Sequence, residues 1–243
     1  MCLSCRFSMI PVMVDGNRQD VLTDRVYETV KAMVMDHEIA PGARVSIEGL
    51  ARQLDVSATP VREALARLEA DGLVVKRPNA GYRATDLLDP EALTDLFEMR
   101  LLLEPRAAAL AAENAGDDDL SHLRAVVDEM RRHPDTGENY SVYRRFALLD
   151  QDFHDALAAA AGRPLLAEAV GRLHAHLHMF RLNSAPGAAG PTIEEHERIL
   201  DAVVRRNPEQ AAEAMATHLR SSRVRHRPHV PATKSTRRRD TIR

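Results

Sequence analysis

The sequence predicts a mainly α-helical protein in two parts, an N-terminal winged helix-turn-helix and a C-terminal all-α helical bundle of about six helices. Three observations predict this fold class. Two short helical segments with their own caps and a β-hairpin follow one another between residues 46 and 85. Residues 90–224 contain no strand-like alternation of any length, and their apolar residues recur at helical spacing. Aromatic residues make up only 4% of the chain, whereas Ala, Leu and Val abound, which favours helices.

The segment from Asp55 to Gly72 predicts a short helix with a defined start and end. Ser57 is a favourable N-cap because its hydroxyl can accept a hydrogen bond from the first turn, and Gly72 suits the position after the last turn. One face of this helix is apolar, and the opposite face is small, polar and rich in arginine. The apolar stripe is Val61, Leu65 and Leu68, and the opposite face carries Thr59, Arg62, Glu63, Ala66 and Arg67.

A second predicted helix, from Ser46 to Leu54, lies only two residues before the first. This arrangement is the helix-turn-helix, in which the second helix enters the major groove of DNA. Two β-prone runs, residues 73–77 and 82–85, flank a turn formed by residues 78–81 and predict the hairpin of a wing. With an amphipathic helix over residues 20–36, these elements predict a winged helix-turn-helix over residues 19–86.

The charge distribution restricts how this first part can bind a nucleic acid. Residues 19–86 carry 9 Lys and Arg against 11 Asp and Glu, so the part is not basic overall, and its positive side chains must gather on one face. Residues 87–222 have a net charge of −9, and residues 223–243 have a net charge of +7. We expect disorder in a tail over residues 1–18 and in a basic tail over residues 225–243.

The cysteines and the apolar runs point to a soluble cytoplasmic protein. Cys2 and Cys5 stand alone, and two ligands do not make a zinc site, so we expect them to lie in a disordered tail in a reducing compartment. No apolar run approaches the ~20 residues of a membrane span. We expect no signal peptide, because the first residues lack a clear basic region and a small-residue cleavage site. We therefore expect no membrane partner.

The second part is expected to form an all-α domain over residues 90–224. Pro105 is expected to kink its first helix or to mark a boundary. A Ser/Ala/Pro/Gly loop is expected over residues 184–191. The predicted helices cover residues 90–114, 117–132, 138–161, 164–183, 192–206 and 208–224.

One carboxylate and three imidazoles stand out in this helical part. Asp150 and His154 are four residues apart and share a helix face, while His196 and His218 lie beside apolar residues on the last two helices. This donor set suits a first-row divalent ion such as zinc, nickel or manganese. The pattern alone leaves a second interpretation open, because Asp–His pairs at this spacing are common on surfaces and a histidine on an apolar stripe is usually a core residue.

Both parts resemble a known family. One set of residues carries the resemblance of the first part: Leu50-Ala51, Val56-Ser57, Thr59-Pro60-Val61-Arg62-Glu63-Ala64-Leu65, Asp71-Gly72-Leu73, Asn79 and Gly81. In order and spacing, this set resembles the DNA-binding domain of GntR-family transcription regulators. The segments Glu98–Glu104, Asp150-Gln-Asp-Phe-His154 and Glu195–Ala202, followed by His218, resemble the FCD ligand-binding domain of the FadR-like branch.

The resemblance implies a function and a set of site residues. It implies a DNA-binding transcription regulator, expected to be a repressor, that binds palindromic half-sites as a homodimer and responds to a small carboxylate-bearing effector. It implies a divalent metal, zinc first with nickel or manganese as alternatives, held by Asp150, His154, His196 and His218. The expected effector-binding residues are Arg100, Arg181 and His174. The expected DNA-binding residues are Ser57, Thr59, Arg62, Arg67, Arg77, Asn79 and Gly81.

Two departures from the family pattern shift the expected DNA contacts. Many members carry an arginine where Ala58 stands and a basic residue where Glu48 stands, so base reading falls more heavily on Arg62 and Thr59. Arg62 has an alternative role in an ion pair with Glu63 or Glu69. Two further interpretations stay open: a metal-dependent hydrolase with a metal-bound water as nucleophile, and a DNA-binding regulator whose metal is purely structural.

Overall fold

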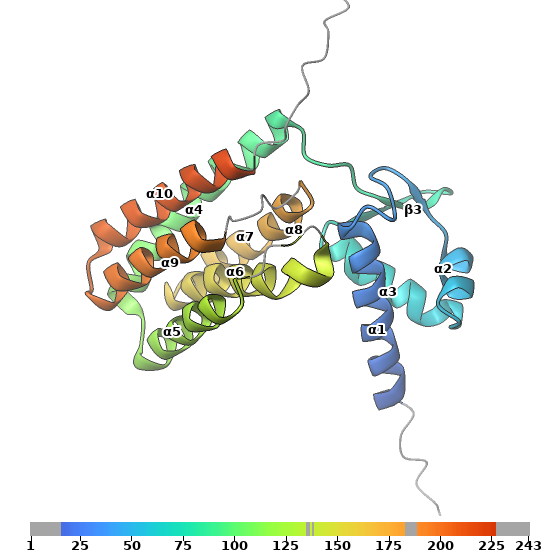
Figure 1. The fold of residues 1–243 in the computed structure, drawn as a ribbon, viewed down its shortest axis with the longest axis horizontal. Coiled ribbons are helices and arrows are strands. Elements are labelled where there is room, and N and C mark those ends of the chain that lie inside the picture. Colours follow the sequence, from blue (N-terminus) through green and yellow to red (C-terminus); the bar gives the residue numbers. More distant parts are fainter. Residues whose placement is uncertain (1–15, 135–136, 138, 183–188, 227–243) are drawn as a thin grey trace, which may run out of the picture. The chain divides into compact units, whose positions relative to one another are not determined.

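The computed structural model describes residues 16–134, 137, 139–182 and 189–226, and the predictions for the two terminal tails concern residues outside these ranges almost entirely. The chain divides into two compact units after Thr85. The predicted fold class is confirmed, with a small winged head before Asp86 and a helical domain after it (Figure 1).

From residue 16 onward, where its description begins, the first unit is a head of three helices and a small sheet. Its helices are α1 (Gly16–Met35), α2 (Ile47–Gln53) and α3 (Ala58–Ala70). Its strands are β1 (Arg44–Val45), β2 (Val74–Arg77) and β3 (Gly81–Ala84), in the order β1-β3-β2, and all neighbours are antiparallel. The sequence did not predict β1, because two residues are too short to show an alternation.

The apolar stripe of α3 forms the core of this head. Val61, Leu65 and Leu68 are fully buried, and α3 packs against α1. Gly72 ends the helix with φ of +73°, a conformation that glycine adopts without strain. Ser46 caps α2 through a hydrogen bond from the Gly49 amide, as expected. Ser57 occupies the N-cap of α3 but makes no side-chain cap bond, so the predicted cap hydrogen bond is wrong and its hydroxyl stays exposed.

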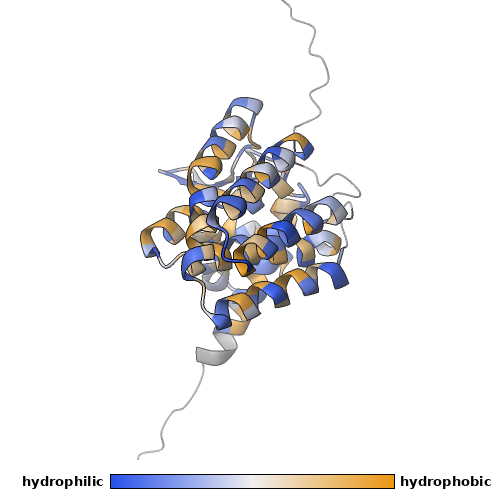
Figure 2. Ribbon diagram, turned by 90° about the vertical axis from the view of Figure 1, so that its left-hand side faces the viewer, coloured by the Kyte–Doolittle hydropathy of each residue, from blue (hydrophilic) through white to orange (hydrophobic). Residues whose placement is uncertain are grey.

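The second unit is built from long helices. Its elements are α4 (Pro90–Asn114), α5 (Asp117–Arg132), α6 (Tyr140–Ala160), α7 (Pro164–Gly171), α8 (Ala175–Phe180), α9 (Ala189–Val204) and α10 (Pro208–Arg225). Helix α10 lies along α4 and α9, and α5 lies along α6 (Figure 1). Polar and apolar residues alternate around individual helices, so each helix has an apolar face to bury (Figure 2).

Four expectations for this unit need correction. The boundary expected at Pro105 as one of two alternatives is wrong, because helix α4 passes through this residue. The helix predicted over residues 164–183 is two short helices, because His174 has φ of +45° and breaks the helical run. Helix α9 begins at Ala189, inside the expected loop, and α10 includes Arg225, which we had assigned to the basic tail.

Candidate functional site

Three buried histidines from three helices converge in the helical domain. His154 of α6, His196 of α9 and His218 of α10 each offer a ring nitrogen within 4.8 Å of the others. Two donors on one tetrahedral zinc lie about 3.3 Å apart, so small side-chain shifts would close this cluster around an ion. Asp150 approaches the same point, with Oδ1 lying 3.6 Å from His196 Nε2. The structure therefore brings the three predicted histidine ligands together, with Asp150 close to one of them.

His196 is the least solvated member of the cluster. Its ring is completely buried and stacks on Phe153, with the ring centroids 4.1 Å apart. Neither ring nitrogen has a hydrogen-bond partner in the described part of the chain. Burial, followed by the neighbouring His218 and His154, lowers the pKa of His196 well below its ordinary value, so the ring is neutral. A neutral buried imidazole without a hydrogen bond is costly unless something accepts its lone pair, and a cation does so.

Buried carboxylates lie against the other two imidazoles. Glu104 Oε2 lies 2.7 Å from His154 Nδ1, at ion-pair distance but without hydrogen-bond geometry, and His218 Nδ1 lies 2.8 Å from Glu195 Oε2 in a hydrogen bond. Burial lowers the pKa of His218, and a carboxylate only accepts hydrogen bonds, so in this ring Nδ1 carries the proton and Nε2 is left as the ligand atom. This is the carboxylate–histidine pattern found around metal sites. Sequence reasoning did not find this role of Glu104 or Glu195, because the partner histidine lies 50 or 23 residues away.

Arg100 lies beside this cluster, as expected. Its Nε donates to Glu104 Oε1 over 2.5 Å, and its Nη2 lies 3.5 Å from His154 Nε2. Arg100 thus forms a buried ion pair with Glu104 of its own helix, next to the predicted metal position. Burial alone would raise the pKa of the Glu104 carboxyl, but Arg100 and His154 outweigh it and hold that pKa below its ordinary value.

A cavity of about 10 Å³ adjoins Arg100 and His154, with room for about one water molecule. Its lining includes His176 and Met179, but neither His174 nor Arg181 belongs to the described lining. The break at His174 explains this difference, because it rotates α8 relative to a continuous helix and turns His176 inward. Arg181 is itself buried, at 1% exposure, and burial lowers its pKa.

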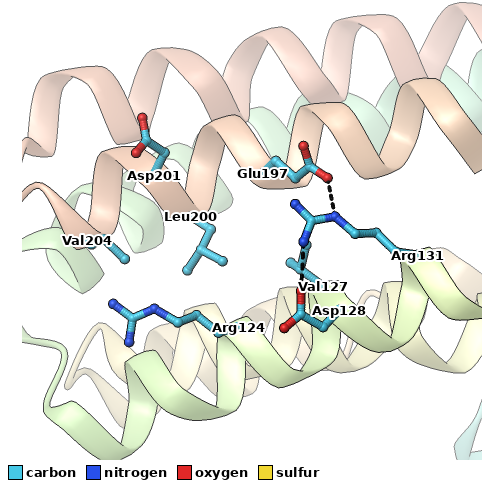
Figure 3. A pocket seen from close by; sticks show the side chains of 8 residues that line it. All are labelled: Arg124, Val127, Asp128, Arg131, Glu197, Leu200, Asp201 and Val204. Carbon is cyan, nitrogen blue, oxygen red and sulfur yellow. Dashed lines mark hydrogen bonds and ion pairs between the residues drawn. The ribbon is translucent and has the colours of Figure 1, made fainter.

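A larger open groove lies elsewhere, between α5 and α9. It has a volume of about 340 Å³ and an apolar floor of Val127, Leu200 and Val204. Arg131 crosses it and donates to Glu197 of α9 and to Asp128 of its own helix (Figure 3). None of the predicted metal or effector residues lines this groove in the described structure.

The head exposes the predicted DNA-facing residues. Ser57, Thr59 and Arg62 are exposed on α3. Glu63 accepts from Thr23 and Glu69 accepts from the Lys76 amide, so these carboxylates have other partners than Arg62. At the tip of the wing, Arg77, Asn79 and Gly81 are exposed, and the last two have φ of +58° and +75°.

Arg67 differs from the other predicted DNA contacts. Its Nη1 donates to Asp24 Oδ1 over 2.5 Å, and its guanidinium lies 4.2 Å from the ring centroid of Tyr27. Both partners belong to α1, so the side chain fastens α3 to α1. Arg67 remains half-exposed.

Among the described residues, no helix combines the length and the apolarity that crossing a membrane requires. Residues 22–83 match the family described as bacterial regulatory proteins, gntR family, and residues 95–221 match the FCD domain.

Curated relatives and a solved structure agree with these matches. The chain is 32% identical to the HTH-type transcriptional regulator LutR of Bacillus subtilis over 77% of this chain and 93% of LutR. It is 28% identical to the HTH-type transcriptional repressor NanR of Cronobacter sakazakii over 82% of this chain and 83% of NanR. The solved structure of E. coli McbR/YncC superposes with a TM-score of 0.64 at 25% identity, covering 86% of this chain and 95% of that one. The chain therefore belongs to the GntR family of DNA-binding transcription regulators and carries a C-terminal FCD domain.

Proposed function

We propose that this regulator is a cytoplasmic homodimeric repressor, without enzymatic activity, whose operator affinity is controlled by a small organic acid bound at a divalent metal in the helical domain. His196 carries the metal part of this proposal, because it is buried beside two further imidazoles and Asp150, and neither of its ring nitrogens has a hydrogen-bond partner among the described residues. The relative NanR is a transcriptional repressor, which supports the repression that we propose for this chain.

The ion would be held by Asp150, His154, His196 and His218. Three imidazole nitrogens and one carboxylate suit zinc, with nickel and manganese as alternatives. When bound, the ion supplies a Lewis-acidic centre that attracts a carboxylate. Arg100 adds a planar cationic fork beside it, which suits the same carboxylate. Arg181 and His174 lie outside the cavity lining, and we give them no direct contact with the effector in this arrangement.

The head would bind DNA through α3 and the wing. Thr59 and Arg62 would contact base edges, while Ser57, Arg77, Asn79 and Gly81 would contact the backbone and the flanking groove. We assign Arg67 a structural role on α1 and at most a phosphate contact. Two copies would present two α3 helices to palindromic half-sites, which raises the affinity of a head that is not basic overall.

A second candidate keeps DNA binding and makes the metal purely structural. The small size of the cavity, about 10 Å³, favours it, because an organic acid enters only after Met179 or a neighbour moves. Calorimetry of carboxylic acids against metal-loaded and metal-free protein separates the two candidates. Binding that requires the metal and changes the affinity for an operator fragment supports ligand control. If no acid binds in a metal-dependent way, ligand control is contradicted and the second candidate, a purely structural metal, is favoured.

A further inference from the structure

The last two turns of α10 contact Glu195, which in turn contacts His218 of the histidine cluster. His218, Ser222 and Arg225 follow one another at helical spacing on one face of α10, and Ser222 is buried between the other two. Arg225 is the last residue of the helix, and its side chain is only 18% exposed. An arginine at a helix end normally extends into solvent, so its inward position requires a partner.

Glu195 is that partner. Arg225 Nη1 donates to Oε1 over 2.8 Å, and Nη2 donates to Oε2 over 2.7 Å, which is the two-pronged geometry that suits arginine and a carboxylate. Oε2 also accepts from His218 Nδ1. One buried carboxylate of α9 thus holds both an arginine and an imidazole of α10.

This arrangement has a consequence for His218. The hydrogen bond to Glu195 fixes the proton on Nδ1 and the orientation of the ring, and the negative charge makes Nε2 a better electron donor. Arg225 in turn fixes the carboxylate, because a buried carboxylate with a single partner would rotate or recruit water. Burial would raise the pKa of Glu195, but its bonds to Arg225 and His218 lower that pKa to about 2, so the carboxylate is charged.

We propose that Glu195 and Arg225 are positioning residues for the metal, and that they link metal affinity to the docking of the last turns of α10 on α9. This inference rests on the metal site of the proposed function. Binding of the ion to His218 stabilises the orientation that Glu195 imposes, and Glu195 holds Arg225. By linkage, an ion that favours the docked α10 end is itself bound more tightly when that end is docked.

A purely structural ion pair would behave differently. It would change the melting temperature of the metal-free protein but leave the metal affinity of the folded protein unchanged. The control is Arg223, on the same helix and also half-buried, whose only described bond is a long one of 3.4 Å to Thr94.

The test is a zinc titration of the full chain, stripped of metal, against a chromophoric chelator. We expect Glu195→Gln and Arg225→Gln each to weaken zinc binding about 10- to 100-fold, and Arg223→Gln to stay within about threefold of the wild type. Circular dichroism checks that each variant is folded. If Arg225→Gln does not fold, Arg225→Lys replaces it, and we expect an intermediate loss because lysine keeps the charge without the fork.

Amide hydrogen exchange at residues 219–226 supplies a second measurement. Zinc should slow exchange there in the wild type and slow it less in Arg225→Gln. If Glu195→Gln and Arg225→Gln both bind zinc as tightly as the wild type and differ only in a lower melting temperature, the inference is overturned and the metal site stands. A wild-type protein that binds no zinc, cobalt or nickel would overturn both this inference and the metal site of the proposed function.

Discussion

The imidazole of His196 lies flat on the phenyl ring of Phe153, with the two rings inclined by 11° and their centroids 4.1 Å apart. The stack fixes the plane of the imidazole, so its nitrogen edges can point only along that plane, towards His218 and Asp150. A packed aromatic neighbour therefore holds the proposed metal ligand in one orientation. A fixed orientation reduces the reorganisation that binding would otherwise require.

Arg62 provides the most direct test of the DNA-reading surface. Arg62→Ala should weaken binding to an operator fragment by about 1–3 kcal/mol, because arginine-to-guanine contacts carry this much discrimination. Fluorescence anisotropy measures this loss of affinity, with a DNA fragment selected from a random-sequence pool as the operator. Arg25→Ala, an exposed arginine of α1, is the control and should bind like the wild type. Equal losses for both variants would show that only general charge matters.

Arg67 should affect stability more than DNA recognition. Arg67→Ala removes the ion pair with Asp24 and the stacking over Tyr27, which together contribute about 0.5–1.5 kcal/mol. Urea unfolding followed by circular dichroism measures the loss. A double-mutant cycle with Asp24→Asn should give a coupling energy above zero, and additive effects would refute the contact.

Arg100 should determine the response to carboxylates. Arg100→Lys keeps the positive charge but loses the fork that contacts Glu104 through Nε and Nη2. We expect at least a tenfold loss of affinity for carboxylic acids that bind the metal-loaded protein, measured by calorimetry. Unchanged affinity would place the effector away from Arg100.

His178 should make stability depend on pH. Burial, followed by the charges of Arg181 and His174, lowers the pKa of His178 to about 4, so the folded protein keeps this ring neutral where the unfolded chain is protonated. Stability is then lost as the pH falls from about 6.5 towards 4, by up to about 2 kcal/mol between pH 7 and pH 5. His178→Gln should reduce this pH dependence in urea unfolding. Wild-type and variant curves that run parallel would contradict the assignment.

The sequence predicted the winged head and most helix bounds because these depend on local patterns. The apolar stripe of α3 and Gly72 are both local signals, and each appears in the structure. The break at His174 was not predictable, because even histidine, which is enriched among residues with positive φ, adopts this conformation only rarely, and nothing in the local sequence specifies it.

The carboxylates that lie against the histidines were also beyond sequence reasoning. Glu104 and Glu195 become recognisable only when α4, α6, α9 and α10 are packed together. The i,i+4 spacing of Arg100 and Glu104, and the adjacency of Glu195 to His196, were the available signals. Neither spacing specifies which histidine the carboxylate will meet.

The central claim is that four side chains gathered from α6, α9 and α10 hold a divalent ion in this regulator. Elemental analysis of the purified wild-type protein and of His196→Ala tests it most directly. We expect about one equivalent of zinc, nickel or manganese per wild-type chain and close to none in the variant. Equal metal content in the two proteins, or none in either after refolding with added zinc, would contradict the claim.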